Sequence, residues 1–150
     1  MNDIAVQYAV PKKSPSVANL KRWATEALNA QKQKSIEMTL RIVAIPEMTK
    51  LNQTYRNKKG PTNVLAFPHE KIKSTERFLG DIVICADVVA AEAASQQKTY
   101  QAHFAHMVVH GTLHLLGFDH VIEKDAIKME KKEIKILQQL GFSNPYKVVI

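Results

Sequence analysis

Residues 110–120 read HGTLHLLGFDH, and this stretch gathers three histidines around the end of one predicted helix. His110 and His114 are four residues apart, so on a helix they share one face, with Cβ atoms about 5–6 Å apart. Gly117 is typical of the left-handed residue that ends a helix. The turn after it can bring His120 back toward the first two rings. Three imidazoles with one open coordination position are the usual catalytic zinc arrangement, so the stretch predicts a metal site at a helix end.

The residue after the first histidine argues against a peptidase of the H-E-x-x-H class. That signature places a glutamate there as the general base, whereas this chain has Gly111. Gly111 has two interpretations that the sequence does not separate: close approach of a backbone or substrate to the metal, or tight helix–helix packing. Asp119 likewise either orients the neighbouring imidazole by accepting its N–H or caps the next helix.

His103 and His106 fall near the same helical stripe as the first two histidines of the stretch. They could be alternative ligands or donors that orient the ligands. We favour a third interpretation, in which they lie on a partly solvated helix face, because histidine pairs at this spacing are common on such faces.

Outward from the histidines, apolar residues recur at strand or helix spacing through most of the chain. Alternation over residues 36–43 is typical of a half-buried strand. Ser14 and Pro15 predict an N-cap and the first helical residue, and Asp87 predicts the cap of a later helix. The expected strands cover residues 4–10, 36–43, 64–67 and 79–86, and the expected helices 15–30, 46–56, 88–94, 99–116 and 122–140.

Strands come early and helices late, which favours an α+β fold over a doubly wound parallel sheet. The length of 150 residues predicts a single domain, residues 1–150, and 45% apolar residues supply a core. Cys85 ends an apolar strand and Trp23 has apolar neighbours at helical spacing, so both are expected in that core. The last helix should carry Ala126, Met129, Leu137 and Leu140 on its apolar side. Its acidic and basic residues, with Glu123, Glu130 and Glu133 among the acids, are interpreted as an ordinary charged face without a site.

The formal net charge of +7 favours polyanionic partners, of which nucleic acid is the commonest. No export signal or run of about 20 apolar residues is present, and there is one cysteine, so we expect a cytoplasmic protein without a membrane partner. The basic residues that could follow single-stranded RNA are Lys12, Lys13, Lys21, Arg22, Arg41, Lys58, Lys59, Lys71, Lys73 and Arg77.

The histidine stretch resembles the H-G-x-L-H-L-x-G-x-D-H signature of the YbeY family of metal-dependent endoribonucleases. Residues 51–56 resemble the family's L-N-x-x-Y-R, and residues 79–82 match its L-G-D-I. Residues 61–68 resemble P-T-[DN]-V-L-S-F-P, with Ala66 where serine is usual. The motifs occur in family order and cover nearly the whole chain.

The resemblance implies a zincin-like α+β fold with a small mixed sheet of about four strands. It implies one Zn²⁺ on His110, His114 and His120, and a catalytic arginine at Arg56. The implied activity is cleavage of single-stranded RNA in rRNA processing, at the 3′ end of 16S rRNA, and in ribosome quality control. The implied partners are the small ribosomal subunit or its assembly factors, with no DNA.

Independently of the resemblance, a guanidinium suits the charge that builds on a phosphodiester under attack, and Arg56 precedes a basic turn. The same arginine could instead stabilise its own helix end. The nucleophile, a metal-bound water or the RNA 2′-hydroxyl, stays open. Two alternative functions also stay open: another metallohydrolase on this fold, such as a metallopeptidase, and a non-catalytic RNA-binding module with a structural metal.

Overall fold

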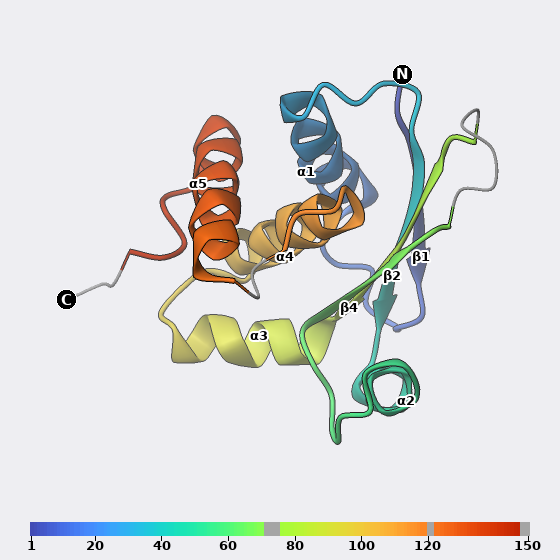
Figure 1. Cartoon of the computed structure of the whole chain (residues 1–150). Helices are drawn as coiled ribbons and strands as arrows, with labels where there is room; N and C mark the ends of the chain where they lie inside the picture. Colours follow the sequence, from blue (N-terminus) through green and yellow to red (C-terminus); the bar gives the residue numbers. More distant parts are fainter. Residues whose placement is uncertain (71–75, 120–121, 148–150) are drawn as a thin grey trace.

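The computed structural model describes residues 1–70, 76–119 and 122–147 (Figure 1). His120, the predicted third ligand, lies outside these residues, as do Lys71 and Lys73. The described elements follow the chain as β1 (Asp3–Tyr8), α1 (Val17–Ala30), β2 (Glu37–Val43), α2 (Ile45–Arg56), β3 (Val64–Pro68), β4 (Phe78–Cys85), α3 (Ala86–Ser95), α4 (Tyr100–Leu115) and α5 (Glu123–Gln139).

The sheet has the order β1-β2-β4-β3 within the described residues. β1, β2 and β4 are parallel, and β3 runs antiparallel to β4 at one edge. This is the mixed sheet of an α+β fold, as predicted. Gly80 allows the two antiparallel strands to approach closely, because a Cβ there would lie 2.3 Å from the carbonyl oxygen of Phe67.

The apolar pattern of each strand explains its place in the sheet. β2 buries Met38, Leu40 and Ile42 on one face, in agreement with the predicted alternation. β4 is a nearly continuous apolar run, which is typical of a central strand covered on both faces. Its Ile82 and Ile84 belong to the main core, whereas Val83 and Cys85 belong to a smaller cluster on the opposite face.

Helices cover both faces of the sheet unequally (Figure 1). α1 and α4 pack on the main core face around the buried Trp23 and Phe104, and α5 packs on α4 from outside. α2 covers the opposite face with Met48 and Leu51. None of the described helices is long and apolar enough to cross a membrane.

Two predicted helix starts are wrong. α1 begins at Val17, and its cap is Ser16, whose Oγ accepts a hydrogen bond from the backbone N–H of Asn19 at 3.1 Å. Ser14 and Pro15 lie before the helix because their carbonyl groups accept hydrogen bonds from the Tyr100 and Tyr8 hydroxyls respectively. α3 begins two residues earlier than expected. Its N-cap is Cys85, and Asp87 lies in its first turn, where a negative charge still favours the helix dipole.

Most other predictions of local structure are confirmed. Cys85 and Trp23 are buried in the core. Gly117 and Gly141 follow the ends of α4 and α5 with φ of +97° and +93°. Gly111 packs against β4, because a Cβ on it would lie 2.9 Å from Cγ2 of Ile82. Gly111 therefore allows tight packing, but its partner is a strand and not the second helix that the packing interpretation expected.

Candidate metal centre and adjoining cleft

The last turns of α4 carry the two predicted ligands that the structure describes. Thr99 caps this helix by accepting a hydrogen bond from the backbone N–H of Ala102 at 3.0 Å. The rings of His110 and His114 lie side by side, with centroids 4.7 Å apart. The His110 side chain is 19% exposed, and His114 is half-buried. The predicted i, i+4 pair thus occupies one accessible helix face, as two ligands of one ion require.

A cleft of about 330 Å³ opens beside these rings. One wall is α4, with His110, Gly111 and His114. The other comes from α2, the turn after it and β3. The residues of this second wall are Asn52, Arg56, Lys58, Thr62, Asn63, Val64, Leu65 and Ala66. The structure therefore brings Arg56, predicted from a separate motif, to the same cleft as the two histidines. Ala66, which departs from the family pattern, also lines it.

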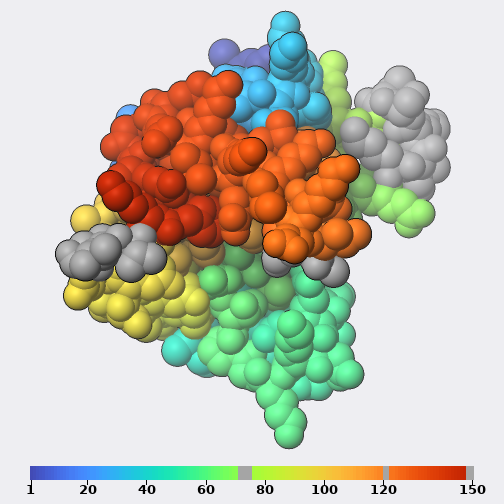
Figure 2. Space-filling view, turned by 60° about the vertical axis from the view of Figure 1, so that its left-hand side comes forward, coloured from blue at the N-terminus to red at the C-terminus, as the bar shows by residue number. Residues whose placement is uncertain are grey.

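The turn that carries the cationic wall is fixed by its own hydrogen bonds. Asn52 is buried and donates through Nδ2 to the carbonyl of Gly60 at 2.9 Å. Asn57 ends α2 in the left-handed conformation, and its N–H bonds back to the carbonyls of the last helical turn. The exposed Arg56 side chain therefore extends from an ordered backbone. Figure 2 shows this green segment projecting from the molecule below the orange and red α5.

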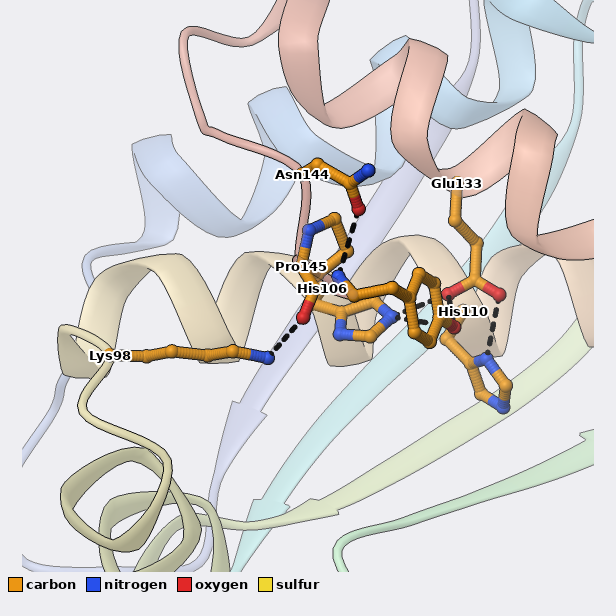
Figure 3. Close-up of polar contacts among 7 residues, drawn as sticks. Lys98, His106, His110, Glu133, Asn144 and Pro145 are labelled. Atoms are coloured by element: carbon orange, nitrogen blue, oxygen red, sulfur yellow. Dashed lines mark hydrogen bonds and ion pairs between the residues drawn. The ribbon is translucent and has the colours of Figure 1, made fainter. Parts of the chain in front are cut away.

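Glu133 of α5 reaches the His110 ring (Figure 3). Its side chain is only 1% exposed. Its Oε2 accepts hydrogen bonds from His106 Nε2 at 2.5 Å and from the Tyr146 hydroxyl at 2.9 Å. Its Oε1 accepts from His110 Nδ1 at 3.2 Å. The carboxylate thus joins α5, α4 and the segment after α5 at a single buried point.

The charge states in this group follow from burial and hydrogen bonding. Burial acts to raise the pKa of Glu133, but the hydrogen bonds from His106 and His110 outweigh it and lower that pKa to about 2. Burial is the largest cause that lowers the pKa of His106, and the hydrogen bond and charge of Glu133 oppose this change without reversing it. Burial and the negative charge of Glu133 raise the pKa of the Tyr146 hydroxyl. The group at neutral pH is therefore an ionised carboxylate that accepts from two imidazoles and a phenol.

Donor atoms of His106, His110 and Glu133 lie within 4.8 Å of one another, so these three residues could hold a metal ion. Imidazole nitrogens and a carboxylate are ligands that zinc accepts, although nickel and copper also accept imidazole. His110 belongs both to this group and to the predicted trio with His114 and His120. The donor chemistry at this end of α4 therefore fits a divalent metal.

The favoured prediction for His103 and His106 is wrong. Their side chains are 4% and 8% exposed, because α3 and α5 cover that side of α4. Each imidazole has a carboxylate partner instead of solvent. His103 Nε2 lies 2.9 Å from Glu92 Oε1, and Glu92 also accepts from Asn63 Nδ2 at 3.0 Å. Two polar chains thus tie α4 to its neighbours, and one of them reaches the cleft wall at Asn63.

Glu133 is the site residue that sequence reasoning missed, because its helix was interpreted as an ordinary charged face. The feature of the sequence that could have identified Glu133 is its position among the apolar residues of α5. Glu133 follows Met129 by four residues and precedes Ile136 and Leu137 by three and four, and all three are buried. A carboxylate in the apolar stripe of an amphipathic helix requires a buried partner.

Comparison with known proteins places the chain in a family. The family model described as endoribonuclease YbeY matches residues 7–141. The chain belongs to the YbeY family. A Coxiella burnetii protein named endoribonuclease YbeY is 52% identical over 97% of this chain and 99% of its own length. A Nitrosococcus oceani protein of the same name is 49% identical over 97% of both chains.

A solved structure shares the fold of this YbeY-family chain. The solution structure of TM1509 from Thermotoga maritima superimposes with a TM-score of 0.62 at 24% identity and covers 98% of this chain and 99% of its own. The family match includes both walls of the cleft and Glu133, and it ends before Tyr146.

Proposed function

We propose that this chain is a metal-dependent endoribonuclease that cuts single-stranded RNA. The observation that carries the proposal is the cleft, which Arg56 and Lys58 line together with His110 and His114. The names of its close relatives support RNA as the substrate. Within this function, we assign the chain to rRNA processing at the 3′ end of the small-subunit RNA and to ribosome quality control, in the cytoplasm, with the small ribosomal subunit or its assembly factors as partners.

The proposed ligands of one Zn²⁺ per chain are His110, His114 and His120. The first two already lie within reach of a single ion, with ring centroids 4.7 Å apart. When bound, zinc supplies a Lewis acid for a phosphoryl oxygen and lowers the pKa of a coordinated water.

Arg56 is the proposed stabiliser of the charge that develops on the non-bridging phosphate oxygens. A guanidinium is planar, forked and always protonated, so it can meet two of these oxygens together. Its place in the same cleft as the histidines would let one phosphodiester contact both the guanidinium and the proposed ligands. Lys58 in the same cleft adds a second positive charge for the adjoining backbone phosphate.

The test is cleavage of a single-stranded RNA by purified, metal-quantified protein. Removing a preorganised donor of this kind typically costs about 10²–10³ in kcat, so Arg56→Ala should lower kcat by that factor. Chelation and His114→Ala should abolish cleavage. Lys34→Ala is the control, since Lys34 is an exposed cation between α1 and β2 and is not among the cleft residues. Its kcat should stay within about twofold.

Full activity of Arg56→Ala would remove that residue from the mechanism. Metal-dependent cleavage of unstructured protein without RNA cleavage would favour a metallopeptidase and overturn the proposal. Unfolding on chelation, with RNA binding and no RNA cleavage, would instead favour a structural metal. The fragment ends identify the nucleophile: a 5′-phosphate indicates water, and a 5′-hydroxyl indicates the RNA 2′-hydroxyl.

A further inference from the structure

We propose that Glu133 is a positioning residue, which holds the His110 ring with its proton on Nδ1 and so presents Nε2 to the cleft as the ligand atom. His106 and Tyr146 in turn hold Glu133. The part of this inference that concerns metal binding rests on the proposed function. The part that concerns the proton on His110 does not, because it describes the metal-free chain.

The geometry divides the two carboxylate oxygens between different partners (Figure 3). Oε2 accepts from His106 at 2.5 Å and from Tyr146 at 2.9 Å, and Oε1 accepts from His110 at 3.2 Å. Rotation of the carboxylate toward or away from His110 would break the bonds on Oε2. His106 and Tyr146 therefore set the direction from which Oε1 meets the His110 ring.

The direction of these hydrogen bonds fixes a proton. An ionised carboxylate can only accept, so the hydrogen in its contact with His110 belongs to Nδ1. A neutral imidazole carries a single ring proton, and its other nitrogen, Nε2, then holds a lone pair. A carboxylate behind the ring is the usual way that proteins orient a metal-binding histidine and raise its basicity.

The position of Glu133 also argues for a role beyond stability. Its neighbours on the helix stripe, Met129, Ile136 and Leu137, are at most 1% exposed. Well-packed apolar side chains at such a position are often as stabilising as a buried ion pair or more so. A buried carboxylate that accepts from three donors is thus not expected to stabilise the fold more than an apolar side chain would. It is, however, suited to holding one imidazole in one orientation.

The same atoms could alternatively coordinate the ion directly. The distance between His106 Nε2 and Glu133 Oε2 argues against that arrangement. Two ligand atoms of one tetrahedral zinc lie about 3.3 Å apart, given metal–ligand distances near 2.0–2.1 Å. These two atoms are 2.5 Å apart, a short hydrogen-bond contact that is closer than two ligand atoms of one ion. Glu133 therefore orients His110 from behind.

The first experiment reads the proton directly. Long-range proton–nitrogen correlation spectra of the metal-free, ¹⁵N-histidine-labelled chain distinguish an imidazole protonated on Nδ1 from one protonated on Nε2. Wild-type His110 should carry its proton on Nδ1, and Glu133→Ala should lose that preference. Protonation on Nε2 in the wild type, or an unchanged preference in Glu133→Ala, would overturn the inference, whether or not the chain cuts RNA.

The second experiment measures Zn²⁺ affinity by competition with a chromophoric chelator. Loss of such a carboxylate partner typically weakens metal binding by about 10–100-fold, which is the change expected for Glu133→Ala. Tyr146→Phe should show a smaller loss, because His106 still holds Oε2. Glu130→Gln is the matched control: it removes one negative charge from the same helix and should change the affinity less than about twofold.

Two further measurements test the role of Glu133 without relying on Glu133→Ala. If Glu133→Ala does not fold, Glu133→Gln and Tyr146→Phe carry the test, since both preserve side-chain volume; unchanged Zn²⁺ affinity in both would contradict the positioning role. The visible absorption bands of the Co²⁺-substituted chain should keep their wavelengths in Glu133→Gln. A large shift of these bands would show that Glu133 is itself a ligand.

Discussion

The thiol of Cys85 lies fully buried at the end of β4, in the small cluster beneath α2. Burial raises its pKa, so the folded chain holds less thiolate than the unfolded chain at any pH near 9. We expect Ellman's reagent at pH 8 to modify Cys85 far more slowly in the native chain than in urea. The raised pKa also makes the free energy of unfolding depend on pH. The contribution of the Cys85 thiol is fully present below the pKa of the unfolded thiol and decreases as the pH rises above it.

Rapid native modification of Cys85, at the rate measured in urea, would show that this cluster opens readily. Cys85→Ser is the control for the pH dependence, because it removes the titrating thiol. Its free energy of unfolding should fall less between pH 8 and 10 than that of the wild type.

Gly111 packs so closely on Ile82 that a methyl group would displace the helix. The added Cβ would lie 2.9 Å from Cγ2 and 3.1 Å from Cδ1 of Ile82. Overpacking of this kind costs about 1–3 kcal/mol, which should exceed the gain of about 1 kcal/mol in helix propensity from glycine to alanine. Denaturant unfolding of Gly111→Ala should therefore show a lower free energy of unfolding.

A double-mutant cycle separates the contact from the propensity. The cost of Gly111→Ala should shrink or reverse in an Ile82→Ala background, where the opposing side chain is gone. An equal cost in both backgrounds would place its origin elsewhere than this contact.

At the scale of the elements, the two serines near the start of α1 provide a matched pair. Ser16 caps the helix through its Oγ, whereas Ser14 precedes it and contributes its carbonyl to Tyr100. Ser16→Ala should lower the free energy of unfolding by about 1 kcal/mol, and hence the Tm by about 2–4 °C. Ser14→Ala should leave the Tm within about 1 °C. A larger loss of Tm in Ser14→Ala than in Ser16→Ala would indicate that Ser14 is the cap.

Elements were predictable from sequence where the signal is local. Alternation identified β2, and the helix-ending Gly117 identified the end of α4. The cap of α1 was not predictable, because the residues before it are held by tertiary hydrogen bonds from Tyr8 in β1 and from Tyr100, which lies 86 residues from Ser14.

In the candidate site, too, the local features were predictable and those that depend on tertiary packing were not. The spacing of His110 and His114 is local and was predicted, whereas Glu133 meets His110 only through the packing of α5 on α4. The place of Arg56 came from resemblance, and the cleft that joins it to the histidines depends on the position of α2 and β3 relative to α4.

At the scale of the whole molecule, the net charge of +7 makes RNA affinity depend on salt. The logarithm of the association constant for a single-stranded oligonucleotide should fall linearly with the logarithm of salt concentration. Each phosphate contact contributes about 0.7 to the slope. Lys58→Ala should therefore lower the slope by about that amount in fluorescence anisotropy titrations, since Lys58 lines the cleft. Glu26→Ala, on α1, should leave the slope unchanged, and an unaltered slope in Lys58→Ala would exclude a phosphate contact there.

The burial of α4 on all sides should restrict its local unfolding. Eleven of its 16 residues are buried, between the sheet on one side and α1, α3 and α5 on the others. Its amide protons should exchange with deuterated solvent only through the largest opening of the fold, and hence among the slowest in the molecule. His110 and His114 would then lie on the most rigid helix, and their side chains would already be arranged before a metal ion binds. Metal binding should therefore slow amide exchange mainly in the segments that adjoin α4.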